Sequence, residues 1–302
     1  MLKKSQAWLD RQSGTVQIIV IVGFVFLVRT FGFGLYQVPT GSMETTMLVG
    51  ERFFADKLTV WFTPIKRGEV ISFNTPQGKK EQLFDYSENP LVNAWQRYVW
   101  GPSNWTKRVI GIPGDHIVGK VEDGKAVVYL NGEKLDEPYL NKYPLVAAFN
   151  ELPSAQSAAL FSNPTYHYYS FDPKKAWADQ PFYGKAIQPA QLIRNIPQLP
   201  ILPPVTEKME GLDADHMARF EADNTYDVTL GENQYWVMGD NRMGSWDSRM
   251  WGPLDGRLIH GRIKLCIFSL DSLNGWWILD LLAHPISFWS QMRWNRCLKW
   301  VK

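Results

Sequence analysis

The sequence lacks an excess of charge of either sign. It has 32 Lys and Arg residues against 30 Asp and Glu residues, and the formal net charge of +2 is spread along all 302 residues. Proteins that bind nucleic acids usually gather basic residues into a patch or stripe. Because no basic block stands out, we expect no nucleic-acid partner.

Cysteines and clustered metal ligands are also few. Asp240, Asp247 and Asp255 lack the compact spacing of a metal-binding loop, so we predict neither a metal nor another cofactor. If the two cysteines, Cys266 and Cys297, lie outside the cytoplasm, they are in an oxidising compartment, and a disulfide between them is then one alternative. The apolar run around Cys266 is equally typical of a small buried hydrophobic residue.

Long hydrophobic runs are absent apart from one near the N-terminus. Residues 16–36 read VQIIVIVGFVFLVRTFGFGLY, which is roughly 31 Å long as a helix and matches the ~30 Å hydrocarbon core of a bilayer. Arg29 lies toward the end of the run, where its side chain can reach outward. The preceding MLKKSQAWLDRQ is mainly basic, which favours a cytoplasmic N-terminus. We therefore predict residues 1–14 in the cytoplasm, a single transmembrane anchor over 15–36, and the rest outside.

A removable signal peptide is the alternative interpretation of this run. Its apolar region would be residues 16–28, and Gly32 and Gly34 loosely imitate the small residues of a cleavage site. No A-x-A follows the run, and we therefore favour an uncleaved anchor.

The remaining pattern is mainly β. Alternating or β-branched runs predict strands over residues 52–60, 69–74, 106–112, 116–121, 126–130, 133–139, 234–238 and 258–270. Asn131-Gly132 is typical of a hairpin turn. Between about 143 and 227 the periodicity is weak, as in the stretch IPQLPILPP. The pattern indicates a β-rich core over 37–125 and 230–270, interrupted by a less regular β subdomain over 126–229.

Tryptophans crowd the C-terminal segment, residues 271–302. Amphipathic indole rings suit a membrane–water interface, but they also suit the edge of a protein core. Both interpretations stay open for the residues concerned, which are Trp276, Trp277, Trp289, Trp294 and Trp300.

A serine follows the hydrophobic run closely, in the stretch QVPTGSMETTML. Pro39, Gly41 and Ser42 are ordinary turn residues, but Ser42 could also be a nucleophile held near the bilayer. A serine hydroxyl needs a base within hydrogen-bond reach. None of the five histidines lies in a stretch typical of a site. Lys107 precedes an apolar strand, where burial would lower its pKa enough for it to act as the base.

Four segments together resemble the successive boxes of bacterial type I signal peptidases. They are VPTGSM (38–43), RGEVISF (67–73), KRVIGIPGD (107–115) and GDNRMGSWDSRMWG (239–252). Their order, behind an outward-leading anchor, makes the match specific. The resemblance covers residues 16–115 and 234–262.

The resemblance implies a role for each matched residue. Ser42 corresponds to the nucleophile and Lys107 to its general base. Thr40 would complete an oxyanion hole with the Ser42 backbone N–H. Ser245 would orient the lysine amine. The remaining matches are a supporting ion pair, Asp247 and Arg249, and the lining of shallow apolar pockets, Val38, Pro39 and Met43.

Three features depart from the family pattern. Thr45 replaces the proline usual at the second position after the methionine, there is room for one span where many members have two, and Trp246 is bulkier than the usual residue. We expect a less rigid turn after Ser42 and a narrower substrate pocket.

The implied function is a membrane-bound serine endopeptidase of the cytoplasmic (inner) membrane. It would remove signal peptides from exported preproteins after small residues, in the A-x-A pattern, on the outer face. Its partners would be these preproteins and the membrane lipids. Two alternatives are a Ser-Lys self-cleaving repressor-type protease, which lacks a span, and a non-catalytic membrane-anchored envelope scaffold.

Overall fold

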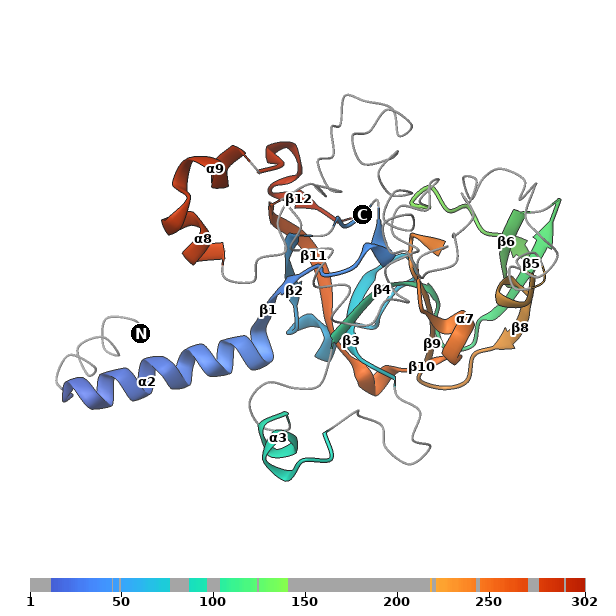
Figure 1. Ribbon diagram of the computed structural model, residues 1–302. Helices are drawn as coiled ribbons and strands as arrows, with labels where there is room; N and C mark the ends of the chain where they lie inside the picture. The colour runs from blue at the N-terminus through green and yellow to red at the C-terminus, as the bar shows by residue number, and fades with distance from the viewer. Residues whose placement is uncertain are drawn as a thin grey trace.

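The structure is a computed structural model that describes residues 12–44, 46–48, 50–76, 87–96, 104–123, 125–140, 218, 221–242, 245–270, 277–290 and 292–301. An apolar N-terminal helix leads into a β-rich body (Figure 1). The helical elements are α2 (Gly14–Leu27), η1 (Val28–Gly32), η2 (Gly41–Met43), η3 (Thr59–Trp61), α3 (Pro90–Trp95), α7 (Ser248–Trp251), η7 (Gly256–Leu258), α8 (Trp277–Ala283), α9 (Pro285–Ser290) and η8 (Trp294–Arg296).

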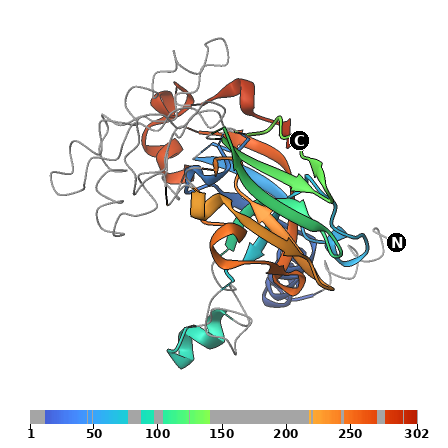
Figure 2. The ribbon, with the colours of Figure 1, turned by 90° about the vertical axis from the view of Figure 1, so that its right-hand side faces the viewer.

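Strands form two antiparallel sheets. The larger follows the order β1-β2-β11-β3-β4-β9-β10, with β12 paired to β11, and the smaller follows β7-β6-β5-β8. Their bounds are β1 (Phe33–Gln37), β2 (Glu51–Asp56), β3 (Val70–Asn74), β4 (Asn104–Gly111), β5 (His116–Glu122), β6 (Lys125–Leu130), β7 (Glu133–Lys134), β8 (Tyr226–Thr229), β9 (Gln234–Met238), β10 (Leu254–Asp255), β11 (Ile259–Ser269) and β12 (Lys299–Trp300). The smaller sheet lies at the end of the body away from α2, and Figure 2 shows α3 standing apart from both sheets.

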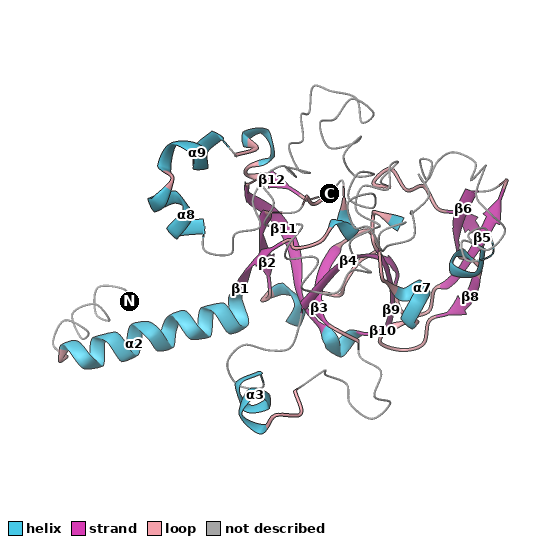
Figure 3. Ribbon diagram, in the orientation of Figure 1, coloured by secondary structure: helices cyan, strands magenta, loops and turns pink. Residues whose placement is uncertain are grey.

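The prediction of a mainly β chain with an apolar N-terminal helix is confirmed (Figure 3). The helix that could span a membrane covers Gly14–Gly32, with a mean hydropathy of 2.0 and no buried residues. The Ser13 side chain caps its start by accepting from the Val16 N–H at 3.5 Å.

The predicted end of the span at residue 36 is wrong. Residues 33–36 belong to β1, which pairs with β2 from Phe33 opposite Asp56 to Gln37 opposite Arg52. A short apolar run fits a strand as well as a helix, so the hydrophobic pattern alone could not place this boundary.

Two predicted strands are shorter than expected. β2 ends at Asp56, because its Oδ1 accepts the N–H groups of Leu58 and Thr59 at 3.0 Å and turns the chain into η3. The hairpin at Asn131-Gly132 is present, with φ values of 52° and 87°, but the strand after it stops at Lys134. β5 belongs to the smaller sheet, where it pairs with β6 and β8, although the sequence places residues 116–122 in the core that ends at 125. The chain therefore passes from the larger to the smaller sheet before residue 126.

Apolar side chains on the two faces of β4 and β9 enter different clusters. Val109 and Val237 join Phe73, Leu254 and Leu258 within the larger sheet. Ile110 and Met238 instead pack with Ile117, Val128, Leu230 and Trp236 against the smaller sheet. Strand alternation thus makes β4 the shared wall of both clusters.

C-terminal tryptophans lie on the surface. Trp289, Trp294 and Trp300 are 48%, 59% and 66% exposed, and Trp289 packs edge-on against the buried Phe288, which fits a core edge as well as a membrane interface. Trp276 lies outside the described residues, as does the side chain of Trp277. Cys266 is buried and Cys297 is partly buried, and both are free thiols, so the disulfide alternative is not realised.

Candidate active site

Ser42 lies in the short helical turn η2, which residues 38–40 join to the end of β1. Two hydrogen bonds close the base of its loop: the Val38 N–H donates to the Glu51 carbonyl at 2.9 Å, and the Gly50 N–H donates to the Val38 carbonyl at 3.0 Å. Asn241 holds the turn from the other side, through its backbone N–H to the Ser42 carbonyl at 3.1 Å and its side-chain amide to the Gly41 carbonyl at 3.1 Å. The first and last sequence boxes therefore meet at the serine.

Lys107 reaches Ser42 from β4. Its Nζ lies 2.8 Å from Ser42 Oγ, and the two residues are 5% and 7% exposed. Thr40 Oγ1 lies 3.5 Å from the same Oγ. The structure thus brings Lys107 to the predicted site residues Thr40 and Ser42, which precede it by more than 60 positions.

Burial lowers the pKa of Lys107 to about 8, from an ordinary value of 10.5. The negative charges of Asp247 and Asp240 oppose this shift, whereas Arg249 adds to it. No carboxylate among the described residues forms an ion pair with Lys107. A useful fraction of the amine is therefore neutral near pH 8 and able to accept a proton.

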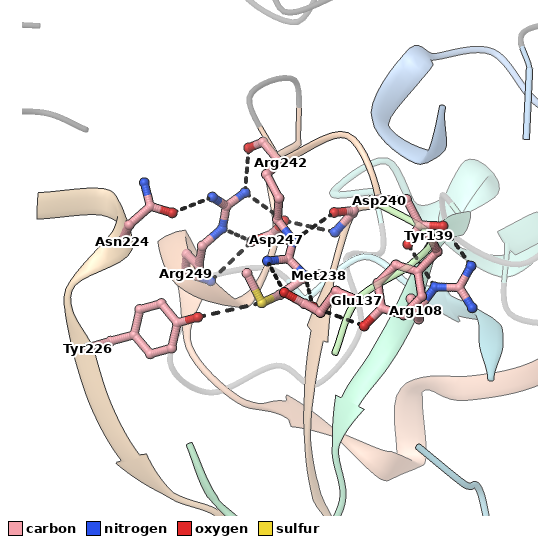
Figure 4. A network of polar contacts seen from close by, with 11 residues as sticks. Arg108, Glu137, Tyr139, Asn224, Tyr226, Met238, Asp240, Arg242, Asp247 and Arg249 are labelled. Atoms are coloured by element: carbon pink, nitrogen blue, oxygen red, sulfur yellow. Dashed lines mark hydrogen bonds and ion pairs between the residues drawn. The ribbon is translucent and has the colours of Figure 1, made fainter. Parts of the chain in front are cut away.

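Asp247 and Arg249 form a buried ion pair behind the dyad. The Arg249 Nε and Nη2 donate to the two oxygens of Asp247 at 2.9 and 3.0 Å, and Asp247 Oδ2 also accepts the Gly239 N–H at 2.9 Å. Burial alone would raise the pKa of Asp247, but Arg249 and these hydrogen bonds hold it below its ordinary value. Arg249 also binds the Arg242 carbonyl and the Asn224 side chain (Figure 4).

Ser245 does not hydrogen-bond Lys107, as the resemblance implies that it would. Its Oγ is buried and makes no hydrogen bond of ordinary geometry, although its proximity helps to lower the pKa of Asp247. The side chain instead packs on Gly239. A Cβ at Gly239 would lie 2.3 Å from Ser245 Oγ and 2.5 Å from the Ser42 carbonyl oxygen, so only glycine fits between them.

A second polar network was not apparent from the sequence. Arg108, the neighbour of Lys107, donates to both oxygens of Asp240 at 2.8 and 2.7 Å and stacks on the Tyr139 ring at 4.1 Å (Figure 4). Arg242 pairs with Glu137 from the segment after β7. The start of the predicted inserted subdomain is thereby tied to the box that begins at Gly239.

The three aspartates considered as metal ligands each pair with an arginine. Besides the pairs with Asp240 and Asp247, Arg257 binds Asp255 at 2.6 Å. Their carboxylates compensate cations, which explains why aspartates recur in this part of the chain without a compact ligand spacing.

An open pocket of about 560 Å³ leads to the dyad. The predicted apolar residues Val38, Pro39 and Met43 line it on one side, and Trp105 and Thr106 of β4 line it on another. Trp246 is 57% exposed at its edge, where the sequence predicts a narrowing. The remaining lining residues are Tyr36, Gln37, Thr40, Ser42, Met47, Asn104 and Lys107.

Neither strand histidine touches the serine. His116 binds Asp227 at 2.6 Å on the smaller sheet. His260 binds Asn104 through Nε2 at 2.8 Å, and burial lowers its pKa to about 4. Lys107 is thus the basic group in contact with Ser42.

Comparisons with known proteins agree with this geometry. The chain matches the family described as "Signal peptidase, peptidase S26" over residues 11–268. It is 24% identical over 256 residues to signal peptidase I of Buchnera aphidicola subsp. Schizaphis graminum, covering 84% of this chain and 73% of that protein. For signal peptidase I of Haemophilus influenzae the identity is 26% over 284 residues, covering 85% and 69% of the two chains.

A shorter match is closer in sequence. Signal peptidase I of Bacillus caldolyticus is 34% identical over 124 residues, which cover 41% of this chain and 53% of that relative. The comparisons support neither a repressor-type protease nor a non-catalytic scaffold. Since the family match spans most of its length, the chain belongs to the signal peptidase family, peptidase S26, and is a hydrolase of that family.

Proposed function

We propose that the chain is a membrane-anchored serine endopeptidase that removes signal peptides from exported preproteins with a Ser42–Lys107 dyad. The observation that carries the proposal is the 2.8 Å contact between Lys107 Nζ and Ser42 Oγ in a buried setting. Burial gives the lysine a pKa of about 8, which suits a general base.

The reaction would proceed through an acyl-enzyme. Neutral Lys107 takes the Ser42 hydroxyl proton as Oγ attacks the scissile carbonyl carbon. The lysine ammonium then gives this proton to the leaving nitrogen as the C–N bond breaks and the mature protein departs. The same amine, neutral again, takes a proton from water as the water oxygen attacks the ester carbonyl carbon. It returns this proton to Ser42 Oγ as the ester C–O bond breaks and the signal peptide leaves with a free carboxylate.

An oxyanion forms on the carbonyl oxygen during both steps. Thr40 Oγ1 and the Ser42 backbone N–H are the donors that we assign to it, since both lie beside the attacking oxygen. In another serine protease, removing one such donor costs roughly 2.7–4 kcal/mol in the transition state.

Substrate choice would follow from the pocket. Val38 and Met43 are 8% and 2% exposed and form a fixed apolar wall beside Ser42, while Trp246 occupies the rim. Side chains at the scissile position and two residues before it would therefore have to be small, as in A-x-A sites. Replacing the scissile alanine of a model preprotein with phenylalanine should prevent cleavage, and unchanged cleavage would contradict this assignment.

Location follows from the N-terminal helix. A basic flank before it favours a cytoplasmic N-terminus in the inner membrane, with the sheets on the outer side. Exported chains present their cleavage sites on that side, close to the bilayer.

The test is incubation of the detergent-solubilised chain with a preprotein, beside a Ser42→Ala variant. We expect one shortened product, with a new N-terminus after a small residue, from the wild type alone. Equal product from both proteins would remove Ser42 as the nucleophile.

We also assign the α8–α9 hairpin to the membrane interface. Its exposed apolar residues include Ile278, Leu279, Leu282 and Ile286, at 54%, 58%, 73% and 87% exposure. The hairpin lies on the same side of the sheets as α2 (Figure 1), so a bilayer that held α2 would be near it.

Flotation with lipid vesicles tests this contact. A chain that lacks residues 1–32 keeps β1 and should still float with vesicles, whereas the same chain with Leu282→Asp and Ile286→Asp should not. Recovery of both chains in the vesicle-free fraction would leave α2 as the sole contact with lipid.

A further inference from the structure

The loop that holds Ser42 contacts the C-terminal segment through a buried ion pair. Arg296 of η8 donates to both carboxylate oxygens of Glu51, at the end of the loop, and its Nη2 donates to the Thr46 carbonyl oxygen at 3.0 Å. The Arg296 side chain is 7% exposed and that of Glu51 is fully buried. A residue close to the C-terminus thus binds the loop at two points.

Glu51 joins three parts of the chain. Its Oε2 accepts the Leu48 N–H at 2.8 Å within the loop, and its Oε1 accepts the Ser269 hydroxyl of β11 at 2.8 Å. The Glu51 side chain thus bonds its own loop, β11 of the larger sheet and Arg296 of η8. Charge-assisted hydrogen bonds of this kind are stronger than neutral ones.

Thr46 is held from its other side by the Arg108–Asp240 pair. Its hydroxyl donates to Asp240 Oδ2, which also accepts from Arg108 Nη2 at 2.7 Å. Arg108 follows Lys107 in β4, so the loop of the serine and the strand of the lysine share one chain of buried contacts. This chain continues from Asp240 through Thr46 to Arg296.

A second buried glutamate in the loop provides a contrast. Glu44 is 1% exposed, and neither of its carboxyl oxygens has a hydrogen-bond partner. Burial raises the pKa of Glu44 well above its ordinary value, which favours a neutral group. Glu44 and Glu51 are therefore both buried in one loop. Glu44 interacts with Arg293 and Arg296 through charge alone, whereas Glu51 also hydrogen-bonds Arg296.

We propose that Arg296 and Glu51 are positioning residues that hold the Ser42 loop at the distance from Lys107 that proton transfer requires. The inference rests on the proposed peptidase function. The side chains of the pair bond Thr46, Leu48 and Ser269, and only the Glu51 backbone carbonyl bonds a pocket residue, Val38. Loss of the side chains should therefore change the rate of the chemical step and leave substrate binding nearly unchanged. Misplacing a reacting group by about 1 Å can lower a rate by on the order of 100-fold.

The experiment measures kcat and KM of the full-length chain for Arg296→Met, Arg296→Lys and Glu51→Gln. We expect kcat to fall by about 10- to 100-fold in Arg296→Met with KM within about twofold of the wild type. Arg296→Lys keeps the charge and should recover part of kcat. Glu44→Met, which removes the unpartnered acid of the same loop, should keep the wild-type kcat.

A stability control separates positioning from general weakening. Ile117→Ala removes a fully buried side chain from the smaller sheet and should lower the melting temperature without lowering kcat at a temperature where the protein is folded. A fall in kcat that follows the melting temperature in all variants, including Ile117→Ala, would overturn the proposal.

Two further outcomes decide the matter. Wild-type kcat in folded Arg296→Met would overturn the role of Arg296, and if that variant does not fold, wild-type kcat in Arg296→Lys and Glu51→Gln would overturn it instead. Failure of the proposed function is recognised separately, because the wild type itself would then not cleave or Ser42→Ala would cleave equally.

Discussion

Lys107 and Arg108 are adjacent buried cations on opposite faces of β4, and they differ in the groups that contact them. Arg108 has a two-point ion pair with Asp240, the Gly68 carbonyl at 2.7 Å and the Tyr139 ring. Lys107 has the Ser42 hydroxyl and apolar neighbours such as Val38 and Met43 in the same pocket. The charge of Arg108 is paired with a carboxylate, whereas that of Lys107 has no ion-pair partner among the described residues.

Under the proposed function, the difference lets one strand provide both a base and a support. A compensated guanidinium keeps its charge and fixes the structure around it. An uncompensated buried amine lowers its own charge instead, because desolvation favours the neutral form. The chemistry therefore depends on which face of the strand receives the carboxylate.

The largest effect should come from removing the uncompensated cation. Lys107→Met has similar length but cannot accept a proton, and we expect cleavage to fall by at least about 1000-fold. Lys107→Arg should fail as well, because its guanidinium stays protonated. Single-turnover cleavage measures both, with the exposed Lys120→Met as control. Near wild-type turnover of Lys107→Met would exclude lysine as the base.

Removing the compensation on the opposite face should reduce stability. Asp240→Asn leaves Arg108 buried without its carboxylate and should lower the free energy of unfolding by about 3–5 kcal/mol. The control is Asp255→Asn, whose partner Arg257 is 67% exposed, and we expect less than about 1 kcal/mol. Urea denaturation of both variants tests the comparison, which equal losses would contradict.

Lys107 should itself reduce stability at neutral pH. Its pKa is about 8 in the folded chain and 10.5 as an ordinary lysine, so below pH 8 both states are protonated and the desolvation penalty is fully present. Between pH 8 and 10.5 the folded state binds fewer protons, and stability rises with pH. At pH 7, the free energy of unfolding of Lys107→Met should thus exceed that of the wild type by up to about 3 kcal/mol. This difference should shrink toward pH 10. A constant difference over this range would show that the amine is not desolvated.

Activity should follow the same titration. Because neutral Lys107 is the proposed base, kcat/KM should rise about tenfold per pH unit below about pH 8, the pKa in the free protein, and level off above it. The pH profile of kcat/KM for a peptide substrate measures this limb. A midpoint near 6.5, the ordinary value for histidine, would point to a different base.

The smallest effect should come from His116. It lies on the smaller sheet in an exposed pair with Asp227, so His116→Ala should keep kcat within about twofold of the wild type. Loss of most activity in a folded His116→Ala protein would place a histidine in the proton path.

Much of the fold could be predicted because strands have a recognisable local sequence pattern. β-branched runs between turn residues located β3, β4, β5, β6, β9 and β11, and Asn131-Gly132 located the hairpin. The end of the span could not be found this way, since residues 33–36 satisfy a helix and a strand equally. Only the pairing of β1 with β2 distinguishes the two.

The site residues also divide into those that local sequence can indicate and those that depend on tertiary contacts. Ser42 and Lys107 could be proposed because their boxes resemble a family and a serine needs a base. Arg296 and Glu51 could not, because an arginine close to the C-terminus gives no local sign that it will meet a loop near the N-terminus. Tertiary pairing of buried charges is the part of the design that a linear pattern does not contain.

The passage from η1 into β1 has no free linker. Gly32 ends the helix, Phe33 begins the strand, and the Lys57 N–H bonds the Gly32 carbonyl at 3.0 Å, so hydrogen bonds lock the junction. With α2 in a bilayer, Ser42 would lie at a set height, no more than roughly 35 Å of extended chain beyond the helix end. Only preproteins whose cleavage sites lie at a matching distance from the membrane would then reach Ser42, whatever side chains flank those sites.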